Sequence, residues 1–312
     1  MKTETDVLAG RVSQGLTVRR RFSNERRRTT AALAFLAPAL VVLGTFVIWP
    51  VVRSFYVALT DDSGFGEAKF IGFDNYIKVF GDPRFLNALG NTLTYAVGTV
   101  PISIAIALSL ALLLNRAVPF RSVFRASIFL PFVASLGIIS IAWASMLDPQ
   151  IGFIAAGLSS IGIPMGNGIR DPSLAMPFVI LVGIWRNVGF FMVLYLAGLQ
   201  SIPGEVKEAA KVDGAGAFRT FGSITWPLLS NTTMFVSIIA VIFSLQAFDQ
   251  IYVMTSGGPF FKTETLVMLI FNTGIEQYKI GYASAMSWVL VLLVLTVSLI
   301  QLGFFRKRTV RY

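Results

Sequence analysis

The sequence predicts an all-α protein that crosses a membrane several times, and three observations carry this prediction. Of the 312 residues, 55% are hydrophobic and only 13% are charged, and the mean hydropathy is +0.72. Soluble domains contain about 25% charged residues, so the shortage of charge is as informative as the apolar excess. Six apolar runs are long enough to cross a bilayer, which takes about 20 helical residues. Basic residues also cluster at the ends of these runs.

The first apolar run begins near Ala31 and continues past Trp49 and Pro50. It is too long for a signal-peptide core and lacks a small-residue cleavage site, so we expect an uncleaved first span. The other five predicted spans are Asn91–Leu114, Val123–Leu147, Leu174–Leu199, Leu228–Phe248 and Tyr282–Phe305. Two shorter apolar stretches, 151–164 and 266–275, are expected to be external interfacial or re-entrant helices, and an eight-span arrangement is the alternative.

The distribution of charge predicts the orientation of the spans. Residues 1–30 and 306–312 are basic, and we expect both to be cytoplasmic tails. The membrane domain is expected to lie between them, at 31–305. The segments predicted inside contain Arg19, Arg20, Arg21, Arg26, Arg27, Arg28, Arg116, Arg121, Lys207, Lys211, Arg219, Arg306, Lys307, Arg308 and Arg311. The segments predicted outside are acidic and contain Asp61, Asp62, Glu67, Asp74, Asp82, Asp148, Asp171, Glu264 and Glu276.

The composition excludes several functions. The chain has no Cys and no His, which excludes disulfides, thiol nucleophiles, imidazole bases and the usual zinc sites, so we expect no metal site. There is no G-x-x-x-x-G-K-[ST] phosphate-binding loop, so we expect no ATP hydrolysis by this chain. The net charge of +10 gathers at span ends, which favours anionic lipid rather than nucleic acid as its partner.

The longest polar connection on the predicted cytoplasmic side is residues 201–227, SIPGEVKEAAKVDGAGAFRTFGSITWP. Ser201 can cap a short helix, with Pro203 in its first turn, where the missing N–H of proline costs nothing. One face of this helix would carry three small or apolar side chains, those of Val206, Ala209 and Ala210.

Asp213-Gly214 should end this first helix, because glycine adopts the left-handed conformation of a sharp turn. A second short helix is expected at 215–221, and Pro227 marks the start of the next span. Two short helices joined at a glycine predict a rigid protrusion between two spans.

The spacing of this stretch resembles the "EAA" loop of ABC-importer permeases, E-A-A-x3-G-x9-I-x-L-P. Six positions match, with Trp226 in place of the usual Leu; they are Glu208, Ala209, Ala210, Gly214, Ile224 and Pro227. An amphipathic connector of no special function is the plain alternative.

The resemblance extends over residues 33–305 and is strongest to the sugar-type permeases, in particular to the first subunit of the pair. PALVVLGTFVIWPVVRSFYVALTD is similar to their first span, FRASIFLPFVAS to the third, GFFMVLYLAGLQSIPGEVKEAAKVDGAG to the fourth with its loop, and FDQIYVMTSGGP to the exit of the fifth. Compared with the maltose permease, the long periplasmic insertion and the extra N-terminal spans are missing. The resemblance therefore implies the compact six-span form of the type I importer fold.

The resemblance implies one subunit of an importer in a bacterial or archaeal cytoplasmic membrane. Its partners would be a second permease, a dimer of ATP-binding subunits that hold ATP and Mg²⁺, and an extracytoplasmic solute-binding protein. The 201–227 loop would dock on the ATPase, with Glu208 offering a carboxylate. Asp213 and Gly214 would set the turn, and the small Ala209 and Ala210 would allow close approach.

Ionisable groups inside spans are costly and are functional candidates by default. Arg186, beside Trp185 and Asn187, is the one such residue placed well inside a predicted span. Gln246 and Asp249 cluster at the outer end of the fifth span. These residues could contact a hydroxyl-rich or anionic solute, such as a sugar or a glycerol-phosphate compound. Bracing between helices is the alternative.

The external turn Gly257-Gly258-Pro259 is a candidate docking surface for the binding protein. Two other classes of function fit the chain less well. A gradient-driven secondary transporter is disfavoured because the spans hold few acidic residues for a proton relay. A membrane-embedded enzyme is disfavoured because no paired carboxylates lie at the span ends.

Overall fold

The computed structural model describes residues 31–116, 119–162 and 166–306. The tails predicted at 1–30 and 307–312 lie outside the described residues. The chain divides into two compact units, one up to Tyr56 and one from Val57 onwards. We describe each unit by itself.

The described part of the first unit is helical from residue 31, through the π-helical segment η1 (Gly44–Ile48) and into α2 (Trp49–Ala58). Its apolar side chains are exposed in the isolated chain, including Phe35 and Phe46. A helix that is apolar on every side is typical of a membrane span.

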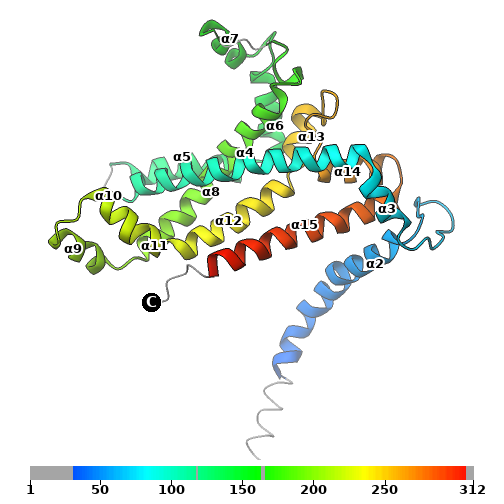
Figure 1. Ribbon diagram of the computed structural model, residues 1–312, viewed down its shortest axis with the longest axis horizontal. Helices are drawn as coiled ribbons and strands as arrows, with labels where there is room; N and C mark the ends of the chain where they lie inside the picture. Colours follow the sequence, from blue (N-terminus) through cyan, green and yellow to red (C-terminus); the bar gives the residue numbers. More distant parts are fainter. Residues whose placement is uncertain (1–30, 117–118, 163–165, 307–312) are drawn as a thin grey trace, which may run out of the picture. The chain divides into compact units, whose positions relative to one another are not determined.

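The second unit is built from helices and irregular connections within its described residues, with one isolated bridge between Thr60 and Phe70. Its elements are α3 (Asp74–Gly81), α4 (Pro83–Leu114), α5 (Arg121–Val133), α6 (Leu136–Met146), α7 (Phe153–Ser160), η2 (Gly168–Arg170), α8 (Ala175–Gln200), α9 (Gly204–Val212), α10 (Ala217–Thr220), η3 (Phe221–Thr225), α11 (Trp226–Leu228), α12 (Ser230–Leu245), α13 (Asp249–Thr255), α14 (Leu266–Phe271), η4 (Asn272–Glu276) and α15 (Ile280–Arg306). In Figure 1, α4, α8, α12 and α15 form the body of the bundle. The predicted all-α class is confirmed.

Four helices in the described residues are long and apolar enough to cross a membrane by themselves: 31–58, α4, α8 and α15. Two more candidate spans appear when each bent helix pair is counted as one, α5 with α6 and 217–228 with α12. The predicted number of six spans is reached only when each bent pair is counted as one span.

The predicted third span, Val123–Leu147, is not a straight helix. It breaks after Val133, and α5 and α6 meet at a bend of 96°. Pro131 lacks the N–H for a helical hydrogen bond, and Ala134 takes an extended conformation (ψ 152°) that ends α5. Helix α12 ends at Leu245, near the end of the predicted fifth span Leu228–Phe248, and α13 starts beyond that span at Asp249.

Helix α8 is the centre of the bundle and packs against α4, α5, α12 and α13. Three glycines permit these close approaches. A Cβ added at Gly183 would overlap the Tyr95 hydroxyl of α4, one at Gly189 the Ile128 carbonyl of α5, and one at Gly198 the side chain of Thr232 on α12. Small residues at helix crossings are the common means of packing helices in membranes, where the hydrophobic effect between helices is weak.

The two short apolar stretches differ from each other. α7, within the predicted 151–164 stretch, lies at the tip of an extension beyond α6 (Figure 1). α14, within 266–275, is buried through Leu266 and Leu269 in a core shared with α4 and α15. The second stretch is therefore a helix packed inside the bundle.

Candidate functional site

The first candidate site is residues 204–228, which we call the coupling region after the role that the resemblance implies for it. Its first helix, α9, ends at a glycine turn: Gly214 has φ +73°, and the Ala215 N–H donates to the Ala210 carbonyl oxygen at 2.9 Å. This six-to-one hydrogen bond with a left-handed glycine is the Schellman arrangement that stops a helix firmly. The predicted helix end at Asp213-Gly214 is therefore confirmed.

Two details of the coupling region differ from the prediction. Ser201 does not cap α9; it ends α8, and its hydroxyl donates to the Gly198 carbonyl oxygen at 2.8 Å. The second helix is longer than 215–221, because it continues from α10 through the π-helical η3 to Leu228. Pro227 thus lies within this helix, which bends by 67° into α12.

The coupling region exposes apolar side chains that the sequence pattern did not single out. Phe218 is 93% exposed and Val212 is 87% exposed, while Ala210 is buried at 5%. Glu208, Ala209 and Asp213 are exposed on α9 and its turn, and Ile224 is half-buried in η3. Two large apolar side chains exposed on one polar segment make this segment a candidate interaction surface. Their exposure depends on the fold, so hydropathy alone could not identify them.

The second candidate site, the central cavity, has a volume of about 240 Å³ and lies at the α5–α6 bend and at the break between α12 and α13. The end of α5, the start of α6, the middle of α8 and the α12–α13 break all contribute to its lining. The lining residues are Tyr95, Phe132, Leu136, Arg186, Asn187, Phe243, Gln246, Ala247, Phe248, Asp249 and Gln250. All four residues proposed from sequence, Arg186, Asn187, Gln246 and Asp249, thus meet in one cavity. Broken helices commonly frame solute sites in transporters.

Arg186 is held in the cavity with unused hydrogen-bonding capacity. Its Nη1 donates to the Asn187 Oδ1 at 3.2 Å, and its Cζ lies 5.0 Å from the centre of the Phe132 ring. Its Nε is buried and has no acceptor among the described residues. The Nη2 makes no hydrogen bond within the described residues and is not among the fully buried atoms, so it, and not the enclosed Nε, is the donor that a ligand in the cavity can reach.

Aromatic rings form one wall of the central cavity. Phe132 stacks on Phe190 at a centroid distance of 4.4 Å and an interplanar angle of 10°, and Phe243 lies 6.3 Å from Phe132. On the outer side, the Gln250 amide donates to the Tyr95 hydroxyl, which fits against α8 at Gly183. The polar groups are therefore set on a rigid, partly apolar frame, as in small-molecule sites.

A second arginine, Arg125, also falls within a predicted span, although it lies near the start of that span and Arg186 lies deeper in its own. Arg125 lies in α5, one turn after Arg121, and its Nε and Nη2 are buried without acceptors among the described residues. α8 is the principal neighbour of α5. The signal was present in the sequence, since Arg125 falls inside the predicted span Val123–Leu147.

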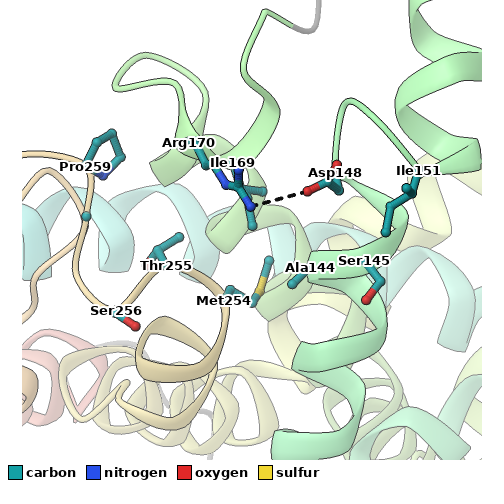
Figure 2. Close-up of a pocket in the computed structure, with 11 residues that line it drawn as sticks. Ala144, Ser145, Asp148, Ile151, Ile169, Arg170, Met254, Thr255, Ser256 and Pro259 are labelled. Carbon is teal, nitrogen blue, oxygen red and sulfur yellow. Dashed lines mark ion pairs between the residues drawn. The ribbon is translucent and has the colours of Figure 1, made fainter.

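A second pocket, of about 440 Å³, is lined in part by the end of α13 (Figure 2). α13 connects the two sites, because Asp249 at its start lines the cavity and Thr255 at its end lines the pocket. Across the pocket, Arg170 Nη2 lies 3.6 Å from Asp148 Oδ2. Gly258 and Pro259 of the predicted docking turn also line this pocket.

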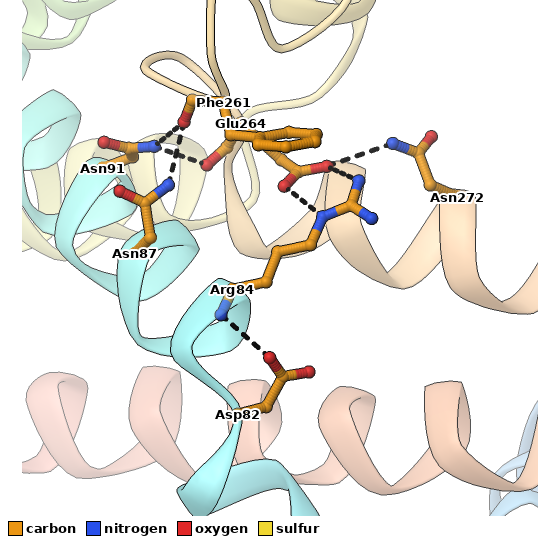
Figure 3. A network of polar contacts seen from close by, with 7 residues as sticks. All are labelled: Asp82, Arg84, Asn87, Asn91, Phe261, Glu264 and Asn272. Carbon is orange, nitrogen blue, oxygen red and sulfur yellow. Dashed lines mark hydrogen bonds and ion pairs between the residues drawn. The ribbon is translucent and has the colours of Figure 1, made fainter.

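A polar network, which we call the outer network, fixes the loop that follows this turn (Figure 3). Arg84 on α4 makes a bidentate pair with the Glu264 carboxylate, whose Oε1 also accepts from Asn272 at 3.2 Å. The amides of Asn87 and Asn91 donate to the Phe261 carbonyl oxygen at 2.9 and 2.7 Å. The loop is thus tied to the first turns of α4.

Comparison with known proteins places these sites in a family. The family model "Binding-protein-dependent transport system inner membrane component" matches residues 76–309. The lactose transport system permease protein LacF of Rhizobium radiobacter is 37% identical over 280 residues, covering 88% of this chain and 93% of that protein. A probable ABC transporter permease protein of Pyrococcus horikoshii is 35% identical over 270 residues, covering 86% and 92%. The sn-glycerol-3-phosphate transport system permease protein UgpA of Agrobacterium fabrum is 30% identical over 275 residues, covering 88% and 94%.

The chain belongs to this family of inner membrane components of binding-protein-dependent transport systems. The predicted class, a permease of an ATP-driven importer that does not itself hydrolyse ATP, is confirmed, and nothing in the comparisons favours a gradient-driven carrier. The fold agrees with a bacterial ABC transporter involved in the import of the acidic polysaccharide alginate, with a TM-score of 0.81 and 24% identity. That match covers 93% of this chain and 100% of the other.

Proposed function

We propose that this permease forms half of a path for a carbohydrate or polyol-type solute and receives the energy for transport through the coupling region. The observation that carries the proposal is the central cavity, which gathers Arg186, Asn187, Gln246 and Asp249 beside aromatic rings. Hydroxyl-rich solutes suit such a lining, because amides and charged groups bind hydroxyls while aromatic faces cover ring carbons. The names of relatives for lactose, diacetylchitobiose and sn-glycerol-3-phosphate support this solute class.

The mechanism that fits this arrangement is alternating access. Two ATP-binding subunits close on ATP, and the coupling region, held between α8 and α12, moves with them. Its glycine-stopped helix and its long second helix transmit the movement as a stiff body. The cavity lies at the α5–α6 bend and the α12–α13 break, where small rotations change which side it opens to. ATP and Mg²⁺ stay on the partner subunits.

The complete transporter would contain a second permease, the ATP-binding dimer and an extracytoplasmic solute-binding protein, in a prokaryotic cytoplasmic membrane with both ends of the chain inside. The acidic outer segments and the turn at Gly258 and Pro259 favour the outside as the docking side for the binding protein. A solved alginate transporter is in complex with a periplasmic protein bound to an alginate pentasaccharide, which supports this partner.

Uptake into proteoliposomes tests the proposal. The full transporter, reconstituted with its co-expressed binding protein, should accumulate the solute that this binding protein carries only when ATP and Mg²⁺ are enclosed. A sodium or proton gradient without ATP should give no accumulation. Accumulation driven by a gradient alone would overturn the proposed function, as would ATP-dependent uptake of a solute without hydroxyl groups.

A further inference from the structure

Helix α3 carries a row of exposed apolar side chains. Phe73 at its N-cap, Ile77 and Phe80 are 67%, 71% and 61% exposed. At about 100° per residue, the three side chains point within about 60° of one another around the helix. We propose that these three residues, which we call the apolar stripe, lie in the interfacial layer of the lipid bilayer, between the headgroups and the acyl chains.

The other two faces of α3 fit a position where protein, lipid and water meet. Asn75 and Val79 are buried, and the Asn75 amide donates to the Ala58 and Thr60 carbonyl oxygens at 3.0 and 2.8 Å. Asp74 and Lys78, one turn apart, are exposed between the apolar stripe and this buried face. A helix with a charged face beside an apolar one is typical of the membrane interface.

The length of α15 places α3 at the depth of the interface. The run 280–305 holds 26 residues without a charge and is about 39 Å long at 1.5 Å per residue. The hydrocarbon core takes only about 20 residues, which reach from Arg306 back to about Met286. Val79 of α3 shares a core with Met286, and Asp82, the C-cap of α3, accepts from the Tyr282 hydroxyl at 2.9 Å. α3 therefore packs on the part of α15 that extends beyond the hydrocarbon.

Other exposed aromatic side chains lie at the same end of α15. Phe65 and Tyr278 are 72% and 52% exposed, and their ring centroids are 5.1 Å apart. Tyr278 comes two residues before α15 begins, and an added Cβ at Gly64, next to Phe65, would meet the Ile280 side chain. Aromatic residues are enriched at both surfaces of a membrane, so this pair supports the same depth.

The apolar stripe belongs to a segment that is joined to two spans (Figure 1). Asp82 follows α3 directly and also caps α4, because its carboxylate accepts from the Arg84 N–H at 2.8 Å. The same side chain accepts from Tyr282 on α15. Interfacial anchors set the depth and tilt of the helices attached to them, so α3 would hold the starts of α4 and α15 at the membrane surface. This inference concerns the bilayer and does not depend on the solute or the energy source.

Site-directed spin labelling of the full transporter in proteoliposomes tests the inference. The chain has no cysteine, so a labelled wild type gives the signal of any cysteines in the other subunits, which is subtracted. Ile77→Cys places a nitroxide on the apolar stripe, and Lys78→Cys is the matched control on the charged face. Collisions are measured with oxygen, which concentrates among acyl chains, and with a nickel chelate that stays in water. We expect the ratio of oxygen to chelate collisions to be several-fold higher at Ile77 than at Lys78.

Two results would overturn the inference. If the chelate reaches the label at Ile77 as readily as at Lys78, the apolar stripe faces water. If neither reagent reaches Ile77, or if adding the binding protein shields it, a protein partner covers the stripe. Phe73→Cys and Asp74→Cys are a second pair on the same two faces and give the comparison where a variant of the first pair fails to assemble.

Discussion

Arg84 and Glu264, 180 residues apart, form a bidentate ion pair at the end of the bundle where α4 begins, with N–O distances of 2.9 and 2.7 Å. The pair is asymmetric: the Glu264 side chain is 1% exposed, whereas that of Arg84 is 33% exposed. It ties the start of α4 to the loop before α14 (Figure 3). The asymmetry makes the two partners unequal in their effect on stability.

We predict that Arg84→Met is more destabilising than Glu264→Gln. Removal of Arg84 leaves a buried carboxylate with Asn272 as its remaining side-chain donor among the described residues, which costs about 3–5 kcal/mol. Removal of the Glu264 charge leaves an arginine that water can reach, so a loss of about 1–2 kcal/mol is expected. Thermal unfolding in detergent measures both. Arg170→Met, which breaks the exposed pair with Asp148, is the control and should change little. Equal losses for both variants would contradict the asymmetry.

Gly189→Ala should separate α5 from α8. The added Cβ would overlap the Ile128 carbonyl oxygen, which is backbone and cannot rotate away, so we expect a loss of about 1–3 kcal/mol and of uptake. Gly90→Ala is the matched control, because nothing lies within 4 Å of its added Cβ and alanine favours a helix by about 0.5–1 kcal/mol. Unfolding temperatures of the two variants that move in the same direction would refute the close helix contact.

Gly214 is required for its backbone conformation and not for space. Its φ is +73°, and nothing lies within 4 Å of an added Cβ. We therefore predict that Gly214→Asn keeps ATP-driven uptake, whereas Gly214→Val loses most of it, since a left-handed β-branched residue costs about 1–2 kcal/mol or more. ATP-driven uptake and the retention of the ATPase on purification are measured for both variants. Equal results for the two variants would contradict a requirement for the left-handed conformation at Gly214.

Arg125 should destabilise the isolated chain. Two of its guanidinium nitrogens are buried without acceptors among the described residues, and a buried polar group left without a partner costs about 1–3 kcal/mol. Arg125→Met is expected to raise the unfolding temperature by a few degrees, while Arg121→Met, exposed on the same helix, leaves it unchanged. A lower unfolding temperature for Arg125→Met would show that the guanidinium has a stabilising partner.

Much of the fold was predictable because it depends on local properties. Span length and apolar content identified α4, α8 and α15, and the left-handed preference of glycine identified the turn at Gly214. The break after Val133 was not predictable, because the apolar run continues through it. Hydropathy reports how apolar a segment is and not whether its helix bends. Arg125 could have been found by the same reasoning that singled out Arg186.

The central cavity illustrates the limit in a different way. The cost of polar groups in spans pointed to Arg186 and Asp249 separately, since that cost is a property of each residue. Their meeting in one cavity depends on how α8 packs on α5 and α13, which is set by Gly183 and Gly189 at the crossings. The aromatic wall of Phe132 and Phe243 was equally hidden, because aromatic residues in spans most often pack against other helices or lipid.

The measurement that tests the account most directly is co-purification of the tagged chain from membranes in mild detergent. We predict that wild type brings down an ATP-binding subunit, and that Phe218→Asp loses it, because Phe218 is 93% exposed on the coupling region. Phe260→Asp, also exposed at 83% but on the loop held by the outer network, should retain it. An ATP-binding subunit that is absent from wild type, or that remains with Phe218→Asp, would contradict the claim that this region couples the chain to ATP.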